Sequence, residues 1–256
     1  MTQATTTPTD MVERWLAIYG ASDADAAALL VDGHDPEAIA FTVIEVEQTD
    51  DQQSGGVRPV TTDITYGELA ERSKRLAAAL AEMGIGRGDT VGVLMGQREE
   101  RVASLLAIAR LGAIYIPLFT AFATPAIEMR LQAGAAKVVI TESSQADKLA
   151  GIDGITTVVA GDQFEELIAA HEPVTESVAV GGDGTLILLF TSGTTGAPKG
   201  VPVPVKALAS FVAYMHFGLD VRADDVFWNA ADPGWAYGLY YGVLGPLAAG
   251  RRNLLL

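Results

Sequence analysis

Cysteine is absent from the 256 residues, and histidine occurs only three times. The absence of cysteine excludes a disulfide framework and thiolate zinc sites. No apolar run approaches the roughly twenty residues that cross a bilayer, and the first ten residues lack the basic and apolar regions of a secretory signal. We therefore expect no metal site within this chain and no membrane span, and we assign the chain to the cytoplasm.

Basic side chains are also scarce, because 17 lysines and arginines face 32 aspartates and glutamates, giving a formal charge of −15. This excess of negative charge opposes attraction to nucleic acid, so we expect no nucleic-acid partner. It also means that an anion site needs a local positive group. The 49% hydrophobic content is sufficient for a large core in one or two domains.

Strand and helix patterns alternate along the middle of the chain. Apolar runs typical of buried strands begin near residues 90, 113, 136, 156 and 185. Amphipathic helices are expected at 66–83, 98–111, 124–134 and 163–170. This alternation predicts an α/β fold with a parallel sheet and right-handed crossovers.

Shorter elements are expected on either side of this region. The pattern predicts a helix at 11–20 with Met11, Trp15 and Ile18 on one face, and a half-exposed strand at 41–48. Residues 50–59 are expected to form a turn or loop. An apolar helix is expected at 205–220, followed by a strand and an aromatic loop, and a new strand begins in the last six residues.

The most informative segment is LLFTSGTTGAPKG at 188–200, which follows the apolar strand at 185–190. A loop after a buried parallel strand emerges at the carboxyl edge of the sheet, where ligands bind in open α/β folds. Its glycines permit close approach of the backbone to an anion, and its hydroxyl groups can donate hydrogen bonds. These residues are Gly193, Gly196 and Gly200, together with Thr191, Ser192, Thr194 and Thr195.

Lys199 adds the positive charge that a polyphosphate requires. The spacing is not that of a Walker A motif, because Gly200 follows the lysine where serine or threonine is needed. A flexible Gly/Ser/Thr linker is the plain alternative. The buried strand before the loop, the proline and the single lysine favour a cradle for the phosphates of a nucleotide triphosphate.

This segment resembles the signature of the AMP-forming adenylating enzymes, the superfamily that includes acyl-CoA synthetases, and it matches at every defined position. The resemblance implies that the loop holds the β- and γ-phosphates of ATP. Thr191, Ser192, Gly193, Thr194, Thr195, Gly196 and Lys199 are then the cofactor-binding residues, with Lys199 as the catalytic group. TYGEL at 65–69 and ARLGAIYIPLF at 109–119 are similar to two further core motifs in the same order.

The segment ADPGWAYGLYYGVLGPLAAG at 231–250 is similar to the acyl-pocket region of this family, most closely that of acetyl- and medium-chain acyl-CoA synthetases. The resemblance implies that Trp235, Tyr237 and Gly238 line the pocket for a small carboxylic acid. Replacement of Gly238 by tryptophan is accordingly expected to shorten the accepted acyl chain. The aromatic residues of this segment are also consistent with plain core packing. His216, without a carboxylate at helical spacing, is interpreted as a packing residue.

The resemblance also implies a domain organisation. Residues 1–10 are expected to form a disordered polar tail, 11–59 an accessory helix and strand segment, and 60–256 the first part of the large AMP-binding domain. The chain is expected to be the truncated N-terminal part of such an enzyme, with the Mg²⁺ ligand and the C-terminal domain downstream. ATP, Mg²⁺ and CoA are the implied cofactors.

Three functions stay open at this point. The first is an AMP-forming acyl-CoA synthetase that activates a small carboxylic acid, with this chain inactive by itself. The second is a noncatalytic nucleotide-binding remnant. The third is an unrelated phosphate-binding α/β protein such as a kinase.

Overall fold

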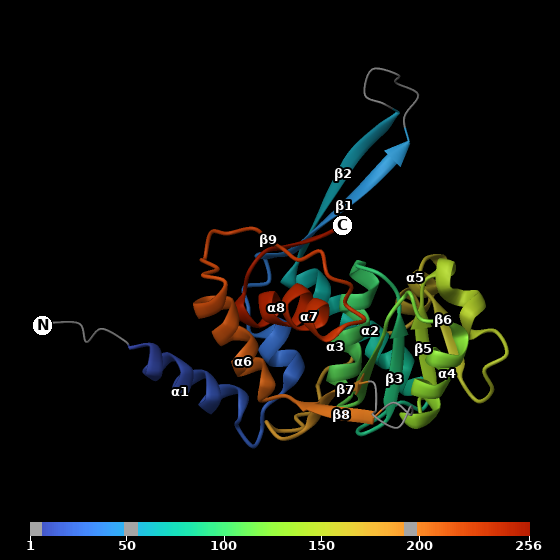
Figure 1. The fold of residues 1–256 in the computed structure, drawn as a ribbon, viewed down its shortest axis with the longest axis horizontal. Coiled ribbons are helices and arrows are strands. Elements are labelled where there is room, and N and C mark those ends of the chain that lie inside the picture. The colour runs from blue at the N-terminus through green and yellow to red at the C-terminus, as the bar shows by residue number, and fades with distance from the viewer. Residues whose placement is uncertain (1–6, 49–55, 192–198) are drawn as a thin grey trace, which may run out of the picture.

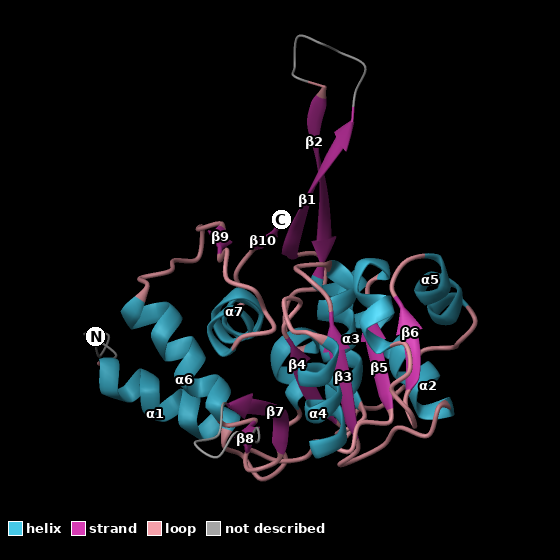
Figure 2. Ribbon diagram, turned by 45° about the vertical axis from the view of Figure 1, so that its right-hand side comes forward, coloured by secondary structure: helices cyan, strands magenta, loops and turns pink. Residues whose placement is uncertain are grey.

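The computed structural model describes residues 7–48, 56–191 and 199–256. Its centre is a six-stranded sheet with the strand order β6-β5-β3-β4-β7-β8, in which only the β7–β8 pair is antiparallel. Figure 2 shows β4, β3, β5 and β6 side by side in this sheet. The strands are β3 (Thr90–Leu94), β4 (Ile114–Leu118), β5 (Val138–Thr141), β6 (Thr156–Val159), β7 (Thr185–Thr191) and β8 (Lys199–Pro204).

Helices cover both faces of this sheet, as the alternating sequence pattern predicts. They are α2 (Tyr66–Glu82), α3 (Glu99–Arg110), α4 (Thr124–Ala133), the 3-10 helix η2 (Ser143–Leu149) and α5 (Asp162–Ala169). Val91 and Val93 of β3 pack with α2, α3 and α5 in one core. Leu94 faces the opposite way and packs with α4 and η2 in a second core. The alternation of side chains along each strand thus separates two apolar layers.

A second sheet has the order β2-β1-β10-β9 and was not expected from the sequence. Its strands are β1 (Ile39–Gln48), β2 (Val57–Thr65), β9 (Phe227–Trp228) and β10 (Asn253–Leu255). The parallel pair β1–β10 joins the first and last parts of the chain, and the β1–β2 hairpin projects from the body of the molecule (Figure 1).

The loop was expected to run from residue 50 to residue 59, but strand β2 already begins at Val57, so the end of that prediction is wrong. Arg58 and Pro59 pair with β1 on an exposed hairpin, where their side chains give little apolar pattern to identify a strand. The division at residue 59 stays a prediction, although β2 runs through it. No helix within the described ranges is long and apolar enough to cross a membrane.

The remaining helices pack beside the end of the central sheet (Figure 1). They are α1 (Pro8–Tyr19), η1 (Ala28–Asp32), α6 (Ala207–Ala213), η3 (Tyr214–Gly218), α7 (Ala236–Leu239), η4 (Tyr240–Leu244) and α8 (Gly245–Ala249). In α1 the buried side chain is Tyr19, whose hydroxyl donates to the carbonyl of Ala248. Of the expected face, Met11 and Trp15 are partly buried and Trp15 packs against the core, but Ile18 is exposed. The helix also begins at Pro8, so residues 8–10 of the tail expected to be disordered are helical.

Candidate functional site

A pocket of about 290 Å³ lies beyond the carboxyl ends of β4 and β7, at the sheet edge where the sequence predicts ligand binding. Its walls come from the two strands, from the region around α4 that follows β4, and from the start of α7. The lining residues are Pro117, Phe122, Arg130, Leu189, Phe190, Thr191, Gly234, Trp235 and Ala236. Thr191 of the expected phosphate loop and Trp235 of the expected acyl pocket therefore meet in one cavity.

The two described ends of the phosphate loop lie opposite each other. Thr191 ends β7 and Lys199 begins β8, and the two residues pair in the antiparallel register. The Thr191 hydroxyl lies 3.5 Å from the Lys199 carbonyl oxygen, and both residues are exposed. Ser192, Gly193, Thr194, Thr195 and Gly196 lie outside the described residues. Strand β8 was not expected, although its prolines are typical of an edge strand.

Three aromatic rings pack together at one side of the site, and two of them, Phe122 and Trp235, line the pocket. The ring centroids of Phe119 and Phe122 lie 5.2 and 5.9 Å from that of Trp235, and 5.5 Å from each other. Such separations are typical of favourable edge-to-face and tilted packing. Trp235 remains 50% exposed, so part of its ring is free to contact a ligand. Neither phenylalanine was identified from the sequence, although both follow directly after a predicted strand.

Hydrogen bonds from the central sheet fix the segment that carries Trp235. The amide of Gln97 donates to the carbonyl oxygens of Asn229 and Ala231, at 2.8 and 3.1 Å. The Asp232 carboxylate accepts from the Thr120 hydroxyl at 2.8 Å. Because Gln97 follows β3 and Thr120 follows β4, the loops of two neighbouring strands hold the segment in place.

Tyr237 and Gly238 do not line this pocket. Tyr237 is 49% exposed and packs its ring 5.0 Å from that of Tyr241. Gly238 is buried, and a Cβ atom there would lie 2.2 Å from the Asp232 carbonyl oxygen. A tryptophan at position 238 would therefore displace backbone before it filled a cavity. That substitution cannot test chain-length preference, and the acyl-pocket role of both residues stays a prediction.

Alanine at position 238 is expected to lower the free energy of unfolding by about 1–3 kcal/mol, the usual cost of overpacking a well-filled site. Gly242→Ala is a matched control, because its Cβ would lie 3.5 Å from the Asn229 Cβ, an ordinary contact. Urea unfolding of the two variants measures the difference. Equal urea midpoints for the two variants would show that the segment around Asp232 makes room for the added methyl group without loss of stability.

Arg130, in the last turn of α4, is the charged side chain that sequence reasoning missed. Its guanidinium carbon lies 4.1 Å from the Phe122 ring centroid, a cation–π contact. Burial lowers the pKa of Arg130 from its ordinary value, because the charged form has lost part of its hydration. One signal in the sequence could have indicated Arg130: it lies in the helix expected at 124–134, which follows the carboxyl end of a predicted strand.

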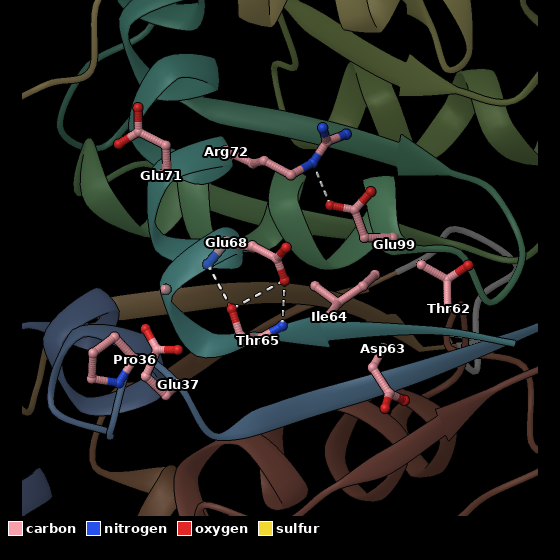
Figure 3. Close-up of a pocket in the computed structure, with 11 residues that line it drawn as sticks. Pro36, Glu37, Thr62, Asp63, Ile64, Thr65, Glu68, Glu71, Arg72 and Glu99 are labelled. Carbon is pink, nitrogen blue, oxygen red and sulfur yellow. Dashed lines mark hydrogen bonds and ion pairs between the residues drawn. The ribbon is translucent and has the colours of Figure 1, made fainter.

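A larger cavity, of about 740 Å³, lies between β2, α2 and α3 (Figure 3). Five carboxylates line it, with Arg72 as the one cation: Glu37, Asp63, Glu68, Glu71 and Glu99. The Thr65–Glu68 capping box starts α2 at its rim, and Arg72 pairs with Glu99. Burial raises the pKa of Glu99, against the opposing effect of Arg72. Its negative charge makes this cavity unsuited to phosphates or carboxylates.

Metal ligands do not gather at either cavity. Among the residues that the structure describes, no three histidine, aspartate or glutamate side chains are arranged to hold a metal ion. The chemistry that the 290 Å³ pocket can supply is therefore binding: an apolar aromatic wall, one hydroxyl group and one cation.

Comparison with known proteins agrees with the motif. The family model described as AMP-binding enzyme matches residues 19–256. An acetyl-coenzyme A synthetase of Burkholderia mallei (strain SAVP1) is 32% identical over 224 residues, which cover 76% of this chain and 34% of the relative. The corresponding protein of Burkholderia thailandensis is 33% identical over 222 residues, which cover 75% of this chain and 34% of the relative.

Solved structures give the same result. An acyl-CoA synthetase of Brucella canis superposes with a TM-score of 0.84 at 36% identity, over 95% of this chain and 45% of that one. Apo MatB of Rhodopseudomonas palustris gives a TM-score of 0.76 at 26% identity, over 91% of this chain and 45% of that one. This chain thus spans about a third to a half of the length of the proteins that it matches, and it belongs to the family of AMP-binding enzymes.

Proposed function

We propose that this chain is the nucleotide-phosphate-binding and acyl-binding part of an AMP-forming acyl-CoA synthetase, which activates a small carboxylic acid in the cytoplasm. The observation that carries the proposal is the common pocket of Thr191 and Trp235. The similarity to acetyl-coenzyme A synthetases supports ATP, a carboxylic acid and CoA as substrates. Family membership disfavours the unrelated kinase.

The proposed reaction has two steps. A carboxylate oxygen attacks the α-phosphorus of ATP, the bond to pyrophosphate breaks, and an acyl adenylate forms. The CoA sulfur, after losing its proton, then attacks the acyl carbonyl, and AMP leaves. Both steps depend on positioning and on stabilising negative charge, and neither needs a nucleophile from the protein.

In this scheme the loop from Thr191 to Lys199 holds the departing pyrophosphate. Lys199 supplies positive charge, and Thr191, Ser192, Thr194 and Thr195 supply hydroxyl donors. Gly193 and Gly196 let the backbone approach the phosphates. Trp235 forms the wall against which the acyl group packs. Tyr237 and Gly238 keep their expected acyl-pocket role in this proposal, although they do not line the 290 Å³ pocket. No residue of this chain is assigned to Mg²⁺, because the described residues offer no ligand set for it.

A noncatalytic nucleotide-binding role is the second candidate, favoured by the pocket's content of one hydroxyl group, one cation and apolar walls, all of them binding groups. ATP–pyrophosphate exchange with short, medium and aromatic acids distinguishes the two, using this chain and the full gene product that contains it. Exchange that depends on a particular acid is the result expected for the full product. Saturable ATP binding without exchange in either form would leave only the noncatalytic role.

A further inference from the structure

The 290 Å³ pocket combines apolar walls with a single charged side chain. Of its lining residues, only Arg130 is charged and only Thr191 carries a hydroxyl. Most of the others are apolar or aromatic, and Phe122 and Trp235 lie against each other. A pocket of this kind suits a ligand with an apolar body and one anionic end.

The Arg130 guanidinium has more N–H donors than its hydrogen bonds to the described protein residues use. Within the described residues its one protein hydrogen bond runs from Nη1 to the Ala126 carbonyl oxygen, at 2.6 Å, and a guanidinium has five N–H donors. Arg72 and Arg110 each pair with carboxylates, whereas Arg130 has no carboxylate within 4.0 Å in the described part of the chain. Residues 192–198, which lie outside the described part of the chain, contain no aspartate or glutamate.

Among the described residues, other cations of the chain also lack a carboxylate partner, as the buried Arg101 does, which binds the Gly96 carbonyl and the Tyr115 hydroxyl. Arg130 differs from them in lining this pocket. Burial has removed part of the water around the guanidinium. The Phe122 ring offsets this loss of hydration on one side only, through the cation–π contact. A carboxylate or phosphate oxygen would supply the missing partner, and arginine binds either of them through two parallel hydrogen bonds.

We propose that Arg130 binds the oxyanion of a ligand whose apolar part lies against Phe122 and Trp235, the oxyanion being a carboxylate or a phosphate. The inference deepens the proposed function and rests on it for the choice of these two chemical sources. Arg130 also lies in the last turn of α4, where a cation interacts favourably with the helix dipole. A role confined to the helix predicts no effect on ligand binding.

Tryptophan fluorescence tests the proposal directly, because Trp235 lies in the same pocket. The chain has three tryptophans, so Trp15→Phe with Trp228→Phe leaves Trp235 as the one reporter. In this background the probes are acetate, hexanoate, benzoate, inorganic pyrophosphate and ATP, each titrated at constant ionic strength. We expect saturable quenching by at least one probe, and a dissociation constant at least about tenfold larger in Arg130→Gln.

Two variants make the result specific. Arg130→Lys keeps the charge at the helix end but loses the paired geometry, so its affinity is expected between those of the parent and Arg130→Gln. Arg58→Gln removes an exposed arginine on the distant hairpin and is expected to bind every probe as the parent does. If Arg130→Gln fails to fold, the comparison of Arg130→Lys with Arg58→Gln carries the test.

The pattern of probes identifies the source of the oxyanion. Arg130-dependent binding of the monocarboxylates indicates the acid, and Arg130-dependent binding of pyrophosphate or ATP indicates a phosphate; either result supports the proposal. Unchanged affinity in the Arg130 variants, or no saturable quenching by any probe, would overturn it. Arg130-dependent binding together with a complete lack of exchange by the full gene product would contradict the proposed function alone.

Discussion

Replacement of Lys199 by alanine is expected to lower acid-dependent ATP–pyrophosphate exchange by about 100-fold or more in the full gene product. Removing one preorganised group that stabilises charge in a transition state commonly has an effect of this size. Lys199 begins β8 opposite Thr191, so its position is set by the strand pair. Binding of the carboxylic acid alone, measured by calorimetry, should change by less than about threefold, because the lysine is expected to meet only phosphate.

Lys206→Ala is the matched control for this variant. Lys206 is an exposed lysine near the same hairpin, and its ammonium group pairs with Asp183 at 2.6 Å. Its removal is expected to leave exchange unchanged. Equal losses of exchange and of acid binding in Lys199→Ala would remove the lysine from the phosphate site, and so would a loss no larger than that of Lys206→Ala.

Five strands of the central sheet were predictable because each has a strong local signal, whereas the edge strand β8 was not expected. The run at Thr90–Leu94 is buried along its whole length, and helix α2 has both an apolar face and the Thr65–Glu68 capping box. Patterns of this kind determine the element without reference to the rest of the chain. The fold class predicted from them, a parallel α/β sheet of the adenylate-forming type, is confirmed by the matching structures.

The second sheet was not predictable for the opposite reason. Strand β10 pairs with β1, more than two hundred residues earlier, and no local pattern specifies such a partner. The exposed hairpin strand β2 buries only Ile64. Its tertiary position, rather than a pattern of apolar residues, defines it as a strand.

The candidate site was predictable in composition but not in shape. The motifs identified Thr191, Lys199 and Trp235, and the sheet-edge rule indicated where they would lie. They did not indicate Arg130, because an arginine on a helix is usually solvated and its environment depends on how α4 meets Phe122. Gly238 does not line the 290 Å³ pocket, and its hydrogen faces the backbone of Asp232, so its acyl-pocket role stays a prediction. Sequence motifs indicate which residues come together in a site, but not how each residue is oriented there.

Removal of the Asp32 carboxylate is expected to destabilise the protein strongly. Arg110 is 2% exposed and binds Asp32 through two hydrogen bonds of 2.7 Å, while its Nε donates to the Ser73 hydroxyl at 2.9 Å. These contacts join η1, α2 and α3. Asp32→Ala would leave a buried guanidinium without its anion, which costs about 3–5 kcal/mol; because Asp32 is partly exposed, we expect the lower end.

Urea unfolding of Asp32→Ala and of Asp183→Ala measures this loss of stability. The two variants carry the same side-chain change, one at a buried ion pair and one at an exposed ion pair. The Asp183–Lys206 pair is exposed, so its loss is expected to leave the unfolding midpoint nearly unchanged. Adding Arg110→Met to Asp32→Ala should recover much of the lost stability, because it replaces the unpaired charge with an apolar side chain. A midpoint for Asp32→Ala equal to that for Asp183→Ala would mean that water reaches Arg110, and that packing rather than the ion pair holds η1 against α3.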